Sequence, residues 1–504
     1  MCRSPTGFYV PVGDIRLAFL NAGLVPPEVG TACELGFGQG MSANLHAAAS
    51  VVRWSGTDFN PSQAAFAREL AQASAAEVAL FDQAFDEFCQ RADLPEFDFI
   101  GLHGIWSWIS DANRSVIVDF IRRKLKVGGV LYISYNTQPG WAAMVPMRDL
   151  LTEHAEVLGA DGAGIVSRID SALGFAEQLL AAKPQYALTN PSIAQRIEQI
   201  KGQDRNYLAH EYFNRDWSPM SFARMGQWLG PAKLQFACSA NYLDALDTIN
   251  LSAEQQQLLA GIPDTGFRQT VRDFCVNQQF RKDYWVKGVR SLSVLEQAER
   301  LRAERLVLVQ PRQEVSLKVN GSLGEASLQQ NVYGPVLDVL ADHQPKTIGQ
   351  IEQALAQLPA GASISFVQLV QVAVVLSGSG AVLPAQSDEA IARASACCAA
   401  LNRHLMNKAR SSADINYLAS PVTGGAISVG RFAQLFLLAR SQGGQAPADW
   451  AQFVWQLLEA QGQRIVKEGQ ALQTAAENLA ELSSQAEEFA LRRLPLLVAL
   501  GVTD

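Results

Sequence analysis

The stretch Glu34-Leu35-Gly36-Phe37-Gly38-Gln39-Gly40 lies between an apolar run and a helical pattern that starts at Met41. Glycines at alternate positions let the backbone turn sharply and let a ligand come close to the main chain. The apolar run, Thr31-Ala32-Cys33-Glu34-Leu35, is typical of a buried strand. A strand, a glycine-rich turn and a helix together predict the first βα unit of a sheet, with a ligand site at the turn.

Outward from this stretch, apolar runs and helical patterns alternate through the N-terminal third of the chain. The apolar runs predict further strands at 51–57, 78–81, 97–102 and 130–135. The helical patterns between them lie at 41–49, 61–76 and 111–124. Strands separated by helices form right-handed βαβ units, so we expect a parallel sheet with both faces covered.

The same sheet is expected to continue further along the chain. Apolar runs at 210–213 and 234–238, on either side of a helix at 218–229, predict its last two strands. The helical stretch at about 144–205 is then an insertion in the sheet domain. The sequence therefore predicts an α/β fold over residues 1–245, a Rossmann-like sheet of seven strands with a helical insertion.

The rest of the chain is mostly helical and is expected to form three accessory domains. Their predicted ranges are 246–330, 331–387 and 388–504. The first, a helical middle or regulatory domain, contains a predicted hairpin with strands at 306–309 and 315–318. The second has three helices followed by a short strand, an order that resembles a winged helix. Its only Lys or Arg is Lys346, which cannot neutralise a DNA backbone, so a protein contact or a structural role is favoured.

Composition and charge exclude several classes of protein. The 504 residues include 41 Lys and Arg against 49 Asp and Glu, a net charge of −8, and a nucleic-acid partner is not expected because phosphate binding needs a basic face. The apolar runs fall far short of the ~20 residues that span a bilayer, so no membrane insertion is expected. Seven cysteines without a CxxC pair indicate a reducing, cytoplasmic compartment. The six histidines lack metal-ligand spacing, so no metal is expected.

Acidic residues follow the second and third predicted strands. Asp58 ends the second strand, 18 residues after Gly40, where a carboxylate can accept hydrogen bonds from both hydroxyls of a ribose. An alternative role is to cap the helix that starts at Pro61, although Asn60 fits that role better. Asp82 follows the third strand, where it either contacts an adenine ring or starts a turn.

Two aromatic loops follow the fourth and fifth predicted strands. Ligands of open α/β sheets bind beyond the carboxyl ends of the strands, so both loops should border the site. Aromatic faces for a sulfonium or an ammonium group are offered by Trp106, Trp108, Tyr135 and Trp141. The alternative is that two of these four side chains belong to the core, which is the commoner fate of tryptophan.

These motifs resemble those of known methyltransferases. The E-x-G-x-G-x-G spacing at 34–40 resembles motif I of class I S-adenosylmethionine-dependent methyltransferases, and differs from the G-x-G-x-x-G of dinucleotide sites. Nearly the whole chain resembles bacterial methyltransferases that carry a methyltransferase regulatory domain, among them outer-membrane-protein lysine methyltransferases. The segments that carry this resemblance are 32–40, 56–61, 103–108, 134–141, 207–212 and 280–283.

The resemblance implies S-adenosylmethionine as methyl donor, a protein lysine as acceptor, and a homodimer. By position, the residues that would hold the methionine part of the donor are Glu34, Gly36, Gly38 and Gly40. Asp58, with Phe59, would hold the ribose. Asp82 would hold the adenine end, and His103 would hold the far side of the donor. The segment before Leu24 departs from the relatives, because only Tyr9 and Pro11 remain of a longer lead-in that covers the donor.

Methyl transfer to an amine sets the expected chemistry. The sulfonium is already electrophilic, so the protein mainly aligns donor and acceptor. A lysine, whose free pKa is ~10.4, must also lose a proton, and an apolar aromatic channel favours that loss by desolvation. We expect Tyr135 and Asn136 to orient the amine and His103 to relay the proton, with Trp106, Trp108 and Trp141 binding the substrate.

Two other functions fit the same motifs. One is methylation of a small molecule or natural product, since no motif separates that acceptor from a lysine. The other is a regulatory or scaffold protein that binds the donor without turnover and recruits partners through its helical C-terminal half. The acceptor, the number of methyl groups added and the general base do not follow from the sequence.

Overall fold

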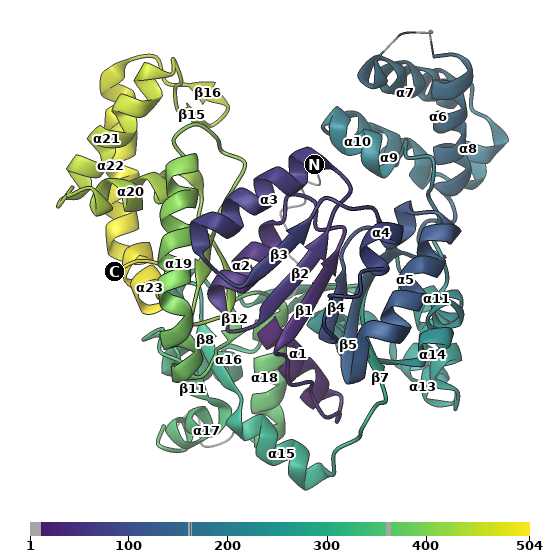
Figure 1. Cartoon of the computed structure of the whole chain (residues 1–504), viewed down its shortest axis with the longest axis horizontal. Helices are drawn as coiled ribbons and strands as arrows, with labels where there is room; N and C mark the ends of the chain where they lie inside the picture. Colours follow the sequence, from purple (N-terminus) through teal and green to yellow (C-terminus); the bar gives the residue numbers. More distant parts are fainter. Residues whose placement is uncertain (1–11, 160–161, 163, 359–363) are drawn as a thin grey trace. The chain divides into compact units, whose positions relative to one another are not determined.

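The computed structural model describes residues 12–159, 162, 164–358 and 364–504 (Figure 1). Tyr9 and Pro11, the remnants of the expected lead-in, lie outside these described residues. The described chain divides into two compact units. The first unit contains 83–239 and 246–288, and the second contains the described residues up to Asp82 together with 240–245 and 289–504. None of the described helices is long and apolar enough to cross a bilayer.

Three parallel strands of the second unit carry the glycine-rich stretch. β1 (Thr31–Leu35) pairs in parallel with β2 (Arg53–Thr57), and β2 pairs in parallel with β3 (Val78–Phe81). β1 is buried along its whole length, as expected of a strand covered on both faces. The strands are in register, so their carboxyl ends lie at one edge.

Two helices connect these strands, and residues at the start of each helix favour its formation. α2 (Met41–Ala49) starts directly after Gly40, which has a left-handed conformation. α3 (Pro61–Ser74) has proline in its first turn, and the side chain of Asn60 accepts hydrogen bonds from the first free N–H groups. The cap of α3 is therefore Asn60, as the sequence favours, which leaves the carboxylate of Asp58 for other contacts.

Four strands lie in the first unit. β4 (Phe97–Leu102) pairs in parallel with β5 (Leu125–Asn136), and β7 (Phe280–Lys287) runs antiparallel to both β5 and β6 (Leu234–Ser239). The seven strands have the order β3-β2-β1-β4-β5-β7-β6. The predicted Rossmann-like α/β fold with seven strands is confirmed, with β7 making the sheet mixed rather than all parallel.

One predicted strand is wrong. Residues 210–213 form no strand, because Asp204 caps the helix α10 (Arg205–Glu211) at this point by accepting from two backbone N–H groups. The sheet instead uses β7, which lies in the middle domain that the sequence predicted to be helical. Arg281 and Asp283 of β7 are buried and neutralise each other, so their charge hid a strand from pattern analysis.

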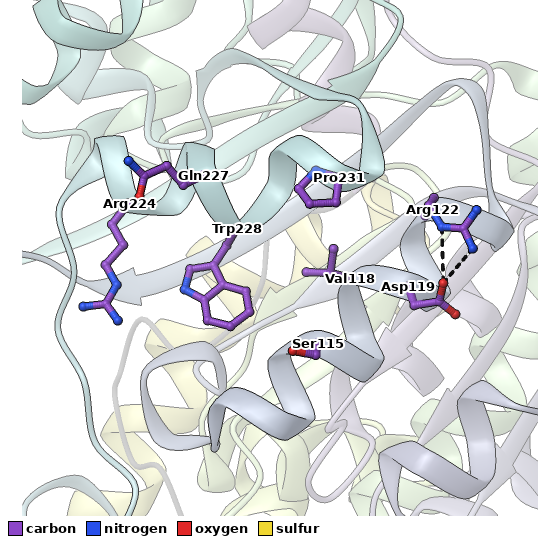
Figure 2. Close-up of a pocket in the computed structure, with 8 residues that line it drawn as sticks. All are labelled: Ser115, Val118, Asp119, Arg122, Arg224, Gln227, Trp228 and Pro231. Carbon is purple, nitrogen blue, oxygen red and sulfur yellow. Dashed lines mark hydrogen bonds and ion pairs between the residues drawn. The ribbon is translucent and has the colours of Figure 1, made fainter.

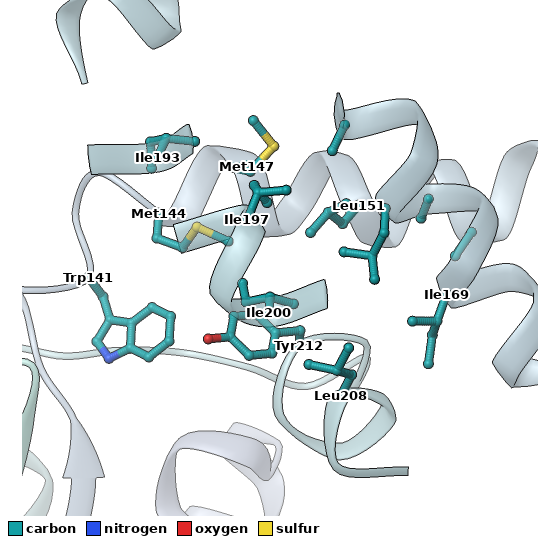
Figure 3. Packing of buried hydrophobic residues seen from close by; sticks show 14 residues of the cluster. Trp141, Met144, Met147, Leu151, Ile169, Ile193, Ile197, Ile200, Leu208 and Tyr212 are labelled. Carbon is teal, nitrogen blue, oxygen red and sulfur yellow. The ribbon is translucent and has the colours of Figure 1, made fainter. Parts of the chain in front are cut away.

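A helical subdomain is inserted between β5 and β6, where the sequence predicts an insertion. Its helices are α6 (Val145–Val157), α7 (Ile165–Ala181), α8 (Gln185–Thr189), α9 (Ser192–Lys201) and α10. Figure 3 shows that it has its own apolar core, to which Ile193, Ile197 and Ile200 contribute at helical spacing from α9. In the same view Trp141 lies at one side of the cluster, and Tyr212 lies beside Ile200 and Leu208.

Other helices of the first unit flank its strands. They are α4 (Phe85–Cys89), α5 (Asp111–Lys124), α11 (Phe222–Leu229), α12 (Asp247–Asn250), α13 (Ala253–Ala260) and α14 (Thr265–Cys275). α5 begins with Ser110 as cap and ends with three basic residues, both of which suit the helix dipole.

The second unit contains the accessory modules. Its further helices are α1 (Val12–Asn21), α15 (Val294–Ala303), α16 (Gln330–Val339), α17 (Ile348–Ala356), α18 (Phe366–Gly378), α19 (Asp388–Lys408), α20 (Arg431–Ser441), α21 (Pro447–Ala460), α22 (Ala475–Glu488) and α23 (Leu494–Ala499). Its smaller strands are β8 (Arg305–Leu308), β9 (Lys318–Gly321), β10 (Gly324–Ser327), β11 (Lys346–Thr347), β12 (Val382–Pro384), β13 (Tyr417–Ser420), β14 (Gly425–Ser428), β15 (Val466–Lys467) and β16 (Gln470–Ala471).

Pairing among the small strands differs from one sequence prediction. The hairpin expected from 306–309 and 315–318 is wrong: β8 pairs with β11 and β12, while β9 pairs with β10. Three helices and a strand do follow in the predicted order as α16, α17, α18 and β12. The resemblance to a winged helix and the predicted domain boundaries stay predictions.

Within the second unit, the C-terminal part of the chain is hydrogen-bonded to helix α2. Gln386 Nε2 donates to the carbonyl of Ala49 at 2.7 Å, and Cys398 Sγ donates to that of Ala48 at 3.3 Å. His46 Nδ1 lies 3.1 Å from the carbonyl oxygen of Gly424. The helix that follows the glycine-rich turn is therefore held by residues more than 300 positions further along the chain.

Candidate functional site

The glycine-rich turn has a backbone that only glycine adopts easily. Gly36, Gly38 and Gly40 have φ angles of +72°, +58° and +65°. A Cβ atom at Gly40 would lie 2.4 Å from Cβ of Ala67 on α3, so a larger residue does not fit there. At Gly38 the same atom would meet only the side-chain oxygen of Gln63, at 4.0 Å. The turn thus packs tightly at Gly40 and leaves open space at Gly38, beside the N-terminus of α2.

Asp58 ties the end of β2 to this turn. Its Oδ2 accepts a hydrogen bond from the N–H of Gly38 at 2.9 Å, and its Oδ1 accepts from that of Asn60 at 2.9 Å. The side chain is buried, and burial raises the pKa of Asp58 while the two N–H groups oppose that rise. Each carboxylate oxygen has room for a second hydrogen bond, so the group can still accept from a ligand hydroxyl.

Glu34 is a buried acid without a cation. Its side chain is 4% exposed, and its Oε2 has no hydrogen-bond partner in the described part of the chain. Burial raises the pKa of Glu34 to about 8; a hydrogen bond from the N–H of Ala43 opposes the rise, and the like charge of Asp58 adds to it. A buried polar atom without a partner is costly, so Glu34 is the kind of group that a bound ligand completes.

The third acid at this edge is more exposed. Asp82, directly after β3, forms an ion pair with Nη2 of Arg68 at 2.6 Å, which lowers the pKa of Asp82. Phe59 is 76% exposed, so its ring is free to cover a ligand. The structure therefore brings Glu34, Asp58 and Asp82 to the ends of three adjacent strands, as predicted.

In the first unit, His103 follows β4 and is neutral at ordinary pH. Its Nδ1 lies 3.0 Å from the hydroxyl oxygen of Tyr132, and the two rings stack. Desolvation, with a contribution from the charge of Lys282, lowers the pKa of His103 to about 4. An imidazole of this pKa hydrogen-bonds well and is a weak base, which does not favour the predicted proton relay.

Tyr135 lies inside a buried ionic network. Its hydroxyl donates to Oδ2 of Asp283 at 2.8 Å. Arg281 pairs with the same carboxylate at 2.9 Å and with Oδ1 of Asp273 at 2.5 Å. Burial raises the pKa of Tyr135 well above its usual value. The hydroxyl that was predicted to orient an amine is thus engaged within the sheet, and this geometry favours a structural role.

Asn136, next to it, joins the two loops that follow β4 and β5. Its backbone N–H donates to Oγ of Ser107 at 2.8 Å, and its carbonyl accepts from the N–H of Met220 at 3.1 Å. Nδ2 of its side chain is buried, and no partner for it is found among the described residues. The Nδ2 group of Asn136 could therefore donate to a ligand, and its role in orienting an amine stays a prediction.

The three tryptophans predicted to bind substrate are packed in the protein interior. Trp106 is 0% exposed and donates from Nε1 to the sulfur of Met220. Trp108 donates to a backbone carbonyl, and Trp141 has the guanidinium of Arg196 over its ring at 4.7 Å. The ring faces are thus covered in this conformation, which favours the alternative that these residues belong to the core.

Comparison with known proteins places the chain in a family. Residues 204–287 match the model of a predicted methyltransferase regulatory domain. An uncharacterized protein of Synechocystis sp., sll1526, is 41% identical over 99% of this chain and 97% of its own length. The chain belongs to the bacterial methyltransferase family that carries this regulatory domain.

Solved structures show the same fold for this methyltransferase. PKMT2 from Rickettsia typhi, in complex with AdoHcy, has a TM-score of 0.68 and 16% identity over 96% of this chain and 98% of its own. A second structure of PKMT2 has a TM-score of 0.67 over 97% and 98% of the two chains. The shared fold includes the accessory modules as well as the sheet.

The regulatory domain of this methyltransferase supplies part of the sheet. The matched residues run from the cap of α10 to the end of β7, so they include Asp273, Arg281 and Asp283. The resemblance of 280–283 to this domain is visible in the sequence, whereas the ionic network is not. The signal available was the buried-strand pattern of Tyr284-Trp285-Val286 directly after the charges.

Proposed function

We propose that this methyltransferase uses S-adenosylmethionine to methylate lysine side chains of a protein. The observation that carries the proposal is the acid-lined glycine turn, in which a buried Glu34 oxygen has no partner among the described residues and a side chain at Gly38 would meet little. These features fit a donor that carries positive charge and a ribose. When bound, such a donor supplies an electrophilic methyl group on its sulfonium.

The residues at this edge have separable tasks. Glu34 would accept from the cationic methionine part, and that positive charge would lower the pKa of Glu34 and so favour its ionised form on binding. Asp58 would accept from the ribose hydroxyls while it holds Gly38 in place. Asp82 and Phe59 would bind the adenine end, and the open Gly38 lets the donor approach the backbone.

The acceptor side rests on different support. Nδ2 of Asn136 has no partner among the described residues, and neutral His103 can accept a hydrogen bond without adding positive charge near an incoming amine. The likeness to PKMT2 over both chains, together with the resemblance to outer-membrane-protein lysine methyltransferases, favours a protein lysine as acceptor. A homodimer and a cytoplasmic location belong to the same proposal.

The test is to incubate the full-length protein with methyl-labelled donor and a bacterial lysate. We expect label in polypeptide, recovered as methyl-lysine after hydrolysis, and none with Asp58→Ala. The control Asp93→Ala changes a side chain that is 66% exposed and should behave as wild type. Label in small molecules alone would instead support the alternative acceptor. Donor binding without any transfer would support the scaffold function.

A further inference from the structure

A groove on the first unit plays no part in the proposed chemistry. It has a volume of about 500 Å³ and lies between α5 and α11, with the turn η2 (Gly230–Ala232) at one end (Figure 2). Its lining residues are Ser115, Val118, Asp119, Arg122, Arg224, Gln227, Trp228 and Pro231. We call it the α5–α11 groove.

The groove has an apolar centre. Val118 is buried, and the side chains of Trp228 and Pro231 lie on the opposite helix and turn. Trp228 also packs edge-on against the fully buried Trp106, with ring centroids 6.0 Å apart. The tryptophan is thus fixed on one side and available to a ligand on the other, which is the arrangement of an aromatic anchor site.

The groove is positive, although the whole chain is acidic. Arg224 is exposed, and its guanidinium has no hydrogen bond or ion pair with any described residue. Arg122 and Arg123 share the single carboxylate of Asp119, at 2.8 and 2.7 Å. Arg123 is not among the lining residues, so the groove itself holds two arginines, Arg122 and Arg224, against the single acid Asp119. Figure 2 shows Arg224 and Arg122 on opposite sides of Trp228 and Pro231.

We propose that the α5–α11 groove binds an acidic segment of a partner protein, with a bulky apolar side chain against Trp228 and carboxylates paired with Arg224 and Arg122. Arginine forks match carboxylates in geometry as well as in charge. A furrow between two helices, with exposed Ser115 and Gln227 on its rim, suits an extended chain that enters and leaves it.

The groove is connected to the loop that follows β4. Trp106, against which Trp228 packs, belongs to that loop, and its neighbour Ser107 accepts the hydrogen bond from the N–H of Asn136. A segment bound in the groove would therefore contact Trp228, which packs against the loop that holds Asn136. Binding of an acidic segment to the groove does not depend on the proposed function. The further idea that this segment belongs to the methyl acceptor does rest on the proposed function.

The test is direct binding without donor. The probe is the peptide Glu-Asp-Phe-Asp-Glu, labelled with fluorescein through a Gly-Gly linker and titrated with the full-length protein by fluorescence anisotropy. We expect Arg224→Glu to weaken binding at least tenfold. The control Arg393→Glu makes the same charge change on α19, at an exposed residue outside the groove, and should leave the affinity unchanged. Trp228→Phe, which keeps an aromatic ring, should weaken binding by a smaller factor.

Two further peptides separate the parts of the proposal. Replacing phenylalanine by alanine should weaken binding, because the apolar anchor is lost, and replacing the four acids by lysine should abolish it. The proposal is overturned if the acidic peptide does not bind, if Arg224→Glu binds it as wild type does, or if the lysine peptide binds equally well. If the wild-type protein binds the acidic peptide but transfers no methyl group, the proposed function fails and the proposal for the groove stands.

Discussion

Two regions of the molecule bury acidic side chains, and they treat the charge in opposite ways. In the regulatory domain, Asp273 and Asp283 both face the guanidinium of Arg281. At the end of β1, Glu34 forms no ion pair with a described residue, and the like charge of Asp58 acts on it. Removing the cation of a buried acid is strongly destabilising, whereas a buried acid with a shifted pKa and no ion pair marks a candidate ligand site. We therefore expect the first region to act structurally and propose the second as the binding site.

The largest expected effect comes from breaking the paired region. Arg281→Ala leaves Asp273 and Asp283 buried without their cation, so the free energy of unfolding should fall by about 3–5 kcal/mol. Urea denaturation followed by circular dichroism measures this. Arg215→Ala, at a side chain that is 87% exposed, should change the value by less than about 0.5 kcal/mol. A fall below about 1 kcal/mol for Arg281→Ala would contradict the assignment of this network.

The second effect concerns the ligand region. Asp58→Ala removes the acceptor for the ribose and the bond to the N–H of Gly38, so affinity for S-adenosylhomocysteine should fall about 100-fold, or about 2.7 kcal/mol. Isothermal titration calorimetry measures it. Asp58→Asn keeps the shape of the side chain and should retain part of the affinity. Equal affinity in wild type and Asp58→Ala would remove Asp58 from the site.

A smaller effect tests the packing of the turn. Gly40→Ala places a Cβ atom 2.4 Å from that of Ala67 in a backbone with φ of +65°, so stability should fall by about 2 kcal/mol. Gly128→Ala is the matched control, since Gly128 also has positive φ and a Cβ there meets nothing within 4 Å. It should lose about 1 kcal/mol. Equal losses would show that the contact with Ala67 relaxes freely.

The smallest effect is a pH dependence from Glu34. Its pKa is about 8 in the folded protein and has the usual lower value when unfolded, so the folded state holds the extra proton between these values. This contribution to stability is fully present below the unfolded pKa and is lost as pH rises through 8. From pH 7 to 8.5 the loss should be about 1 kcal/mol. Glu34→Gln, which does not titrate, should lack this part of the slope in urea denaturation at each pH.

The sequence predicts the ligand region better than the paired region, for a physical reason. The strand, the glycines and Asp58 form one local pattern within 34–58, and backbone geometry dictates where such a pattern lies in a parallel sheet. Arg281 is neutralised by Asp273 and Asp283 and bonded through Asp283 to Tyr135, which is far away in sequence. Only tertiary pairing makes its charge compatible with a buried strand, so the sequence predicted a helical domain at this position.

The aromatic loops show the same limit. Loop position correctly predicts that Trp106 and Trp141 follow β4 and β5, but the direction of each ring depends on neighbours from other elements. Trp106 is buried with Met220, and Trp141 is covered by Arg196 of α9. Asn136, by contrast, has an Nδ2 group without a partner in the described part of the chain, and a short polar residue at a strand end is a signal that the sequence alone offers.

The bonds from Gln386, Cys398 and Gly424 to helix α2 bear on how this enzyme can be engineered. A shortened chain that stops after the regulatory domain would lack these contacts with α2, the helix that follows the glycine-rich turn. Such a minimal catalytic fragment should be unstable or bind donor poorly, so fusions and tags belong at the chain ends rather than at a cut between sheet and C-terminal half.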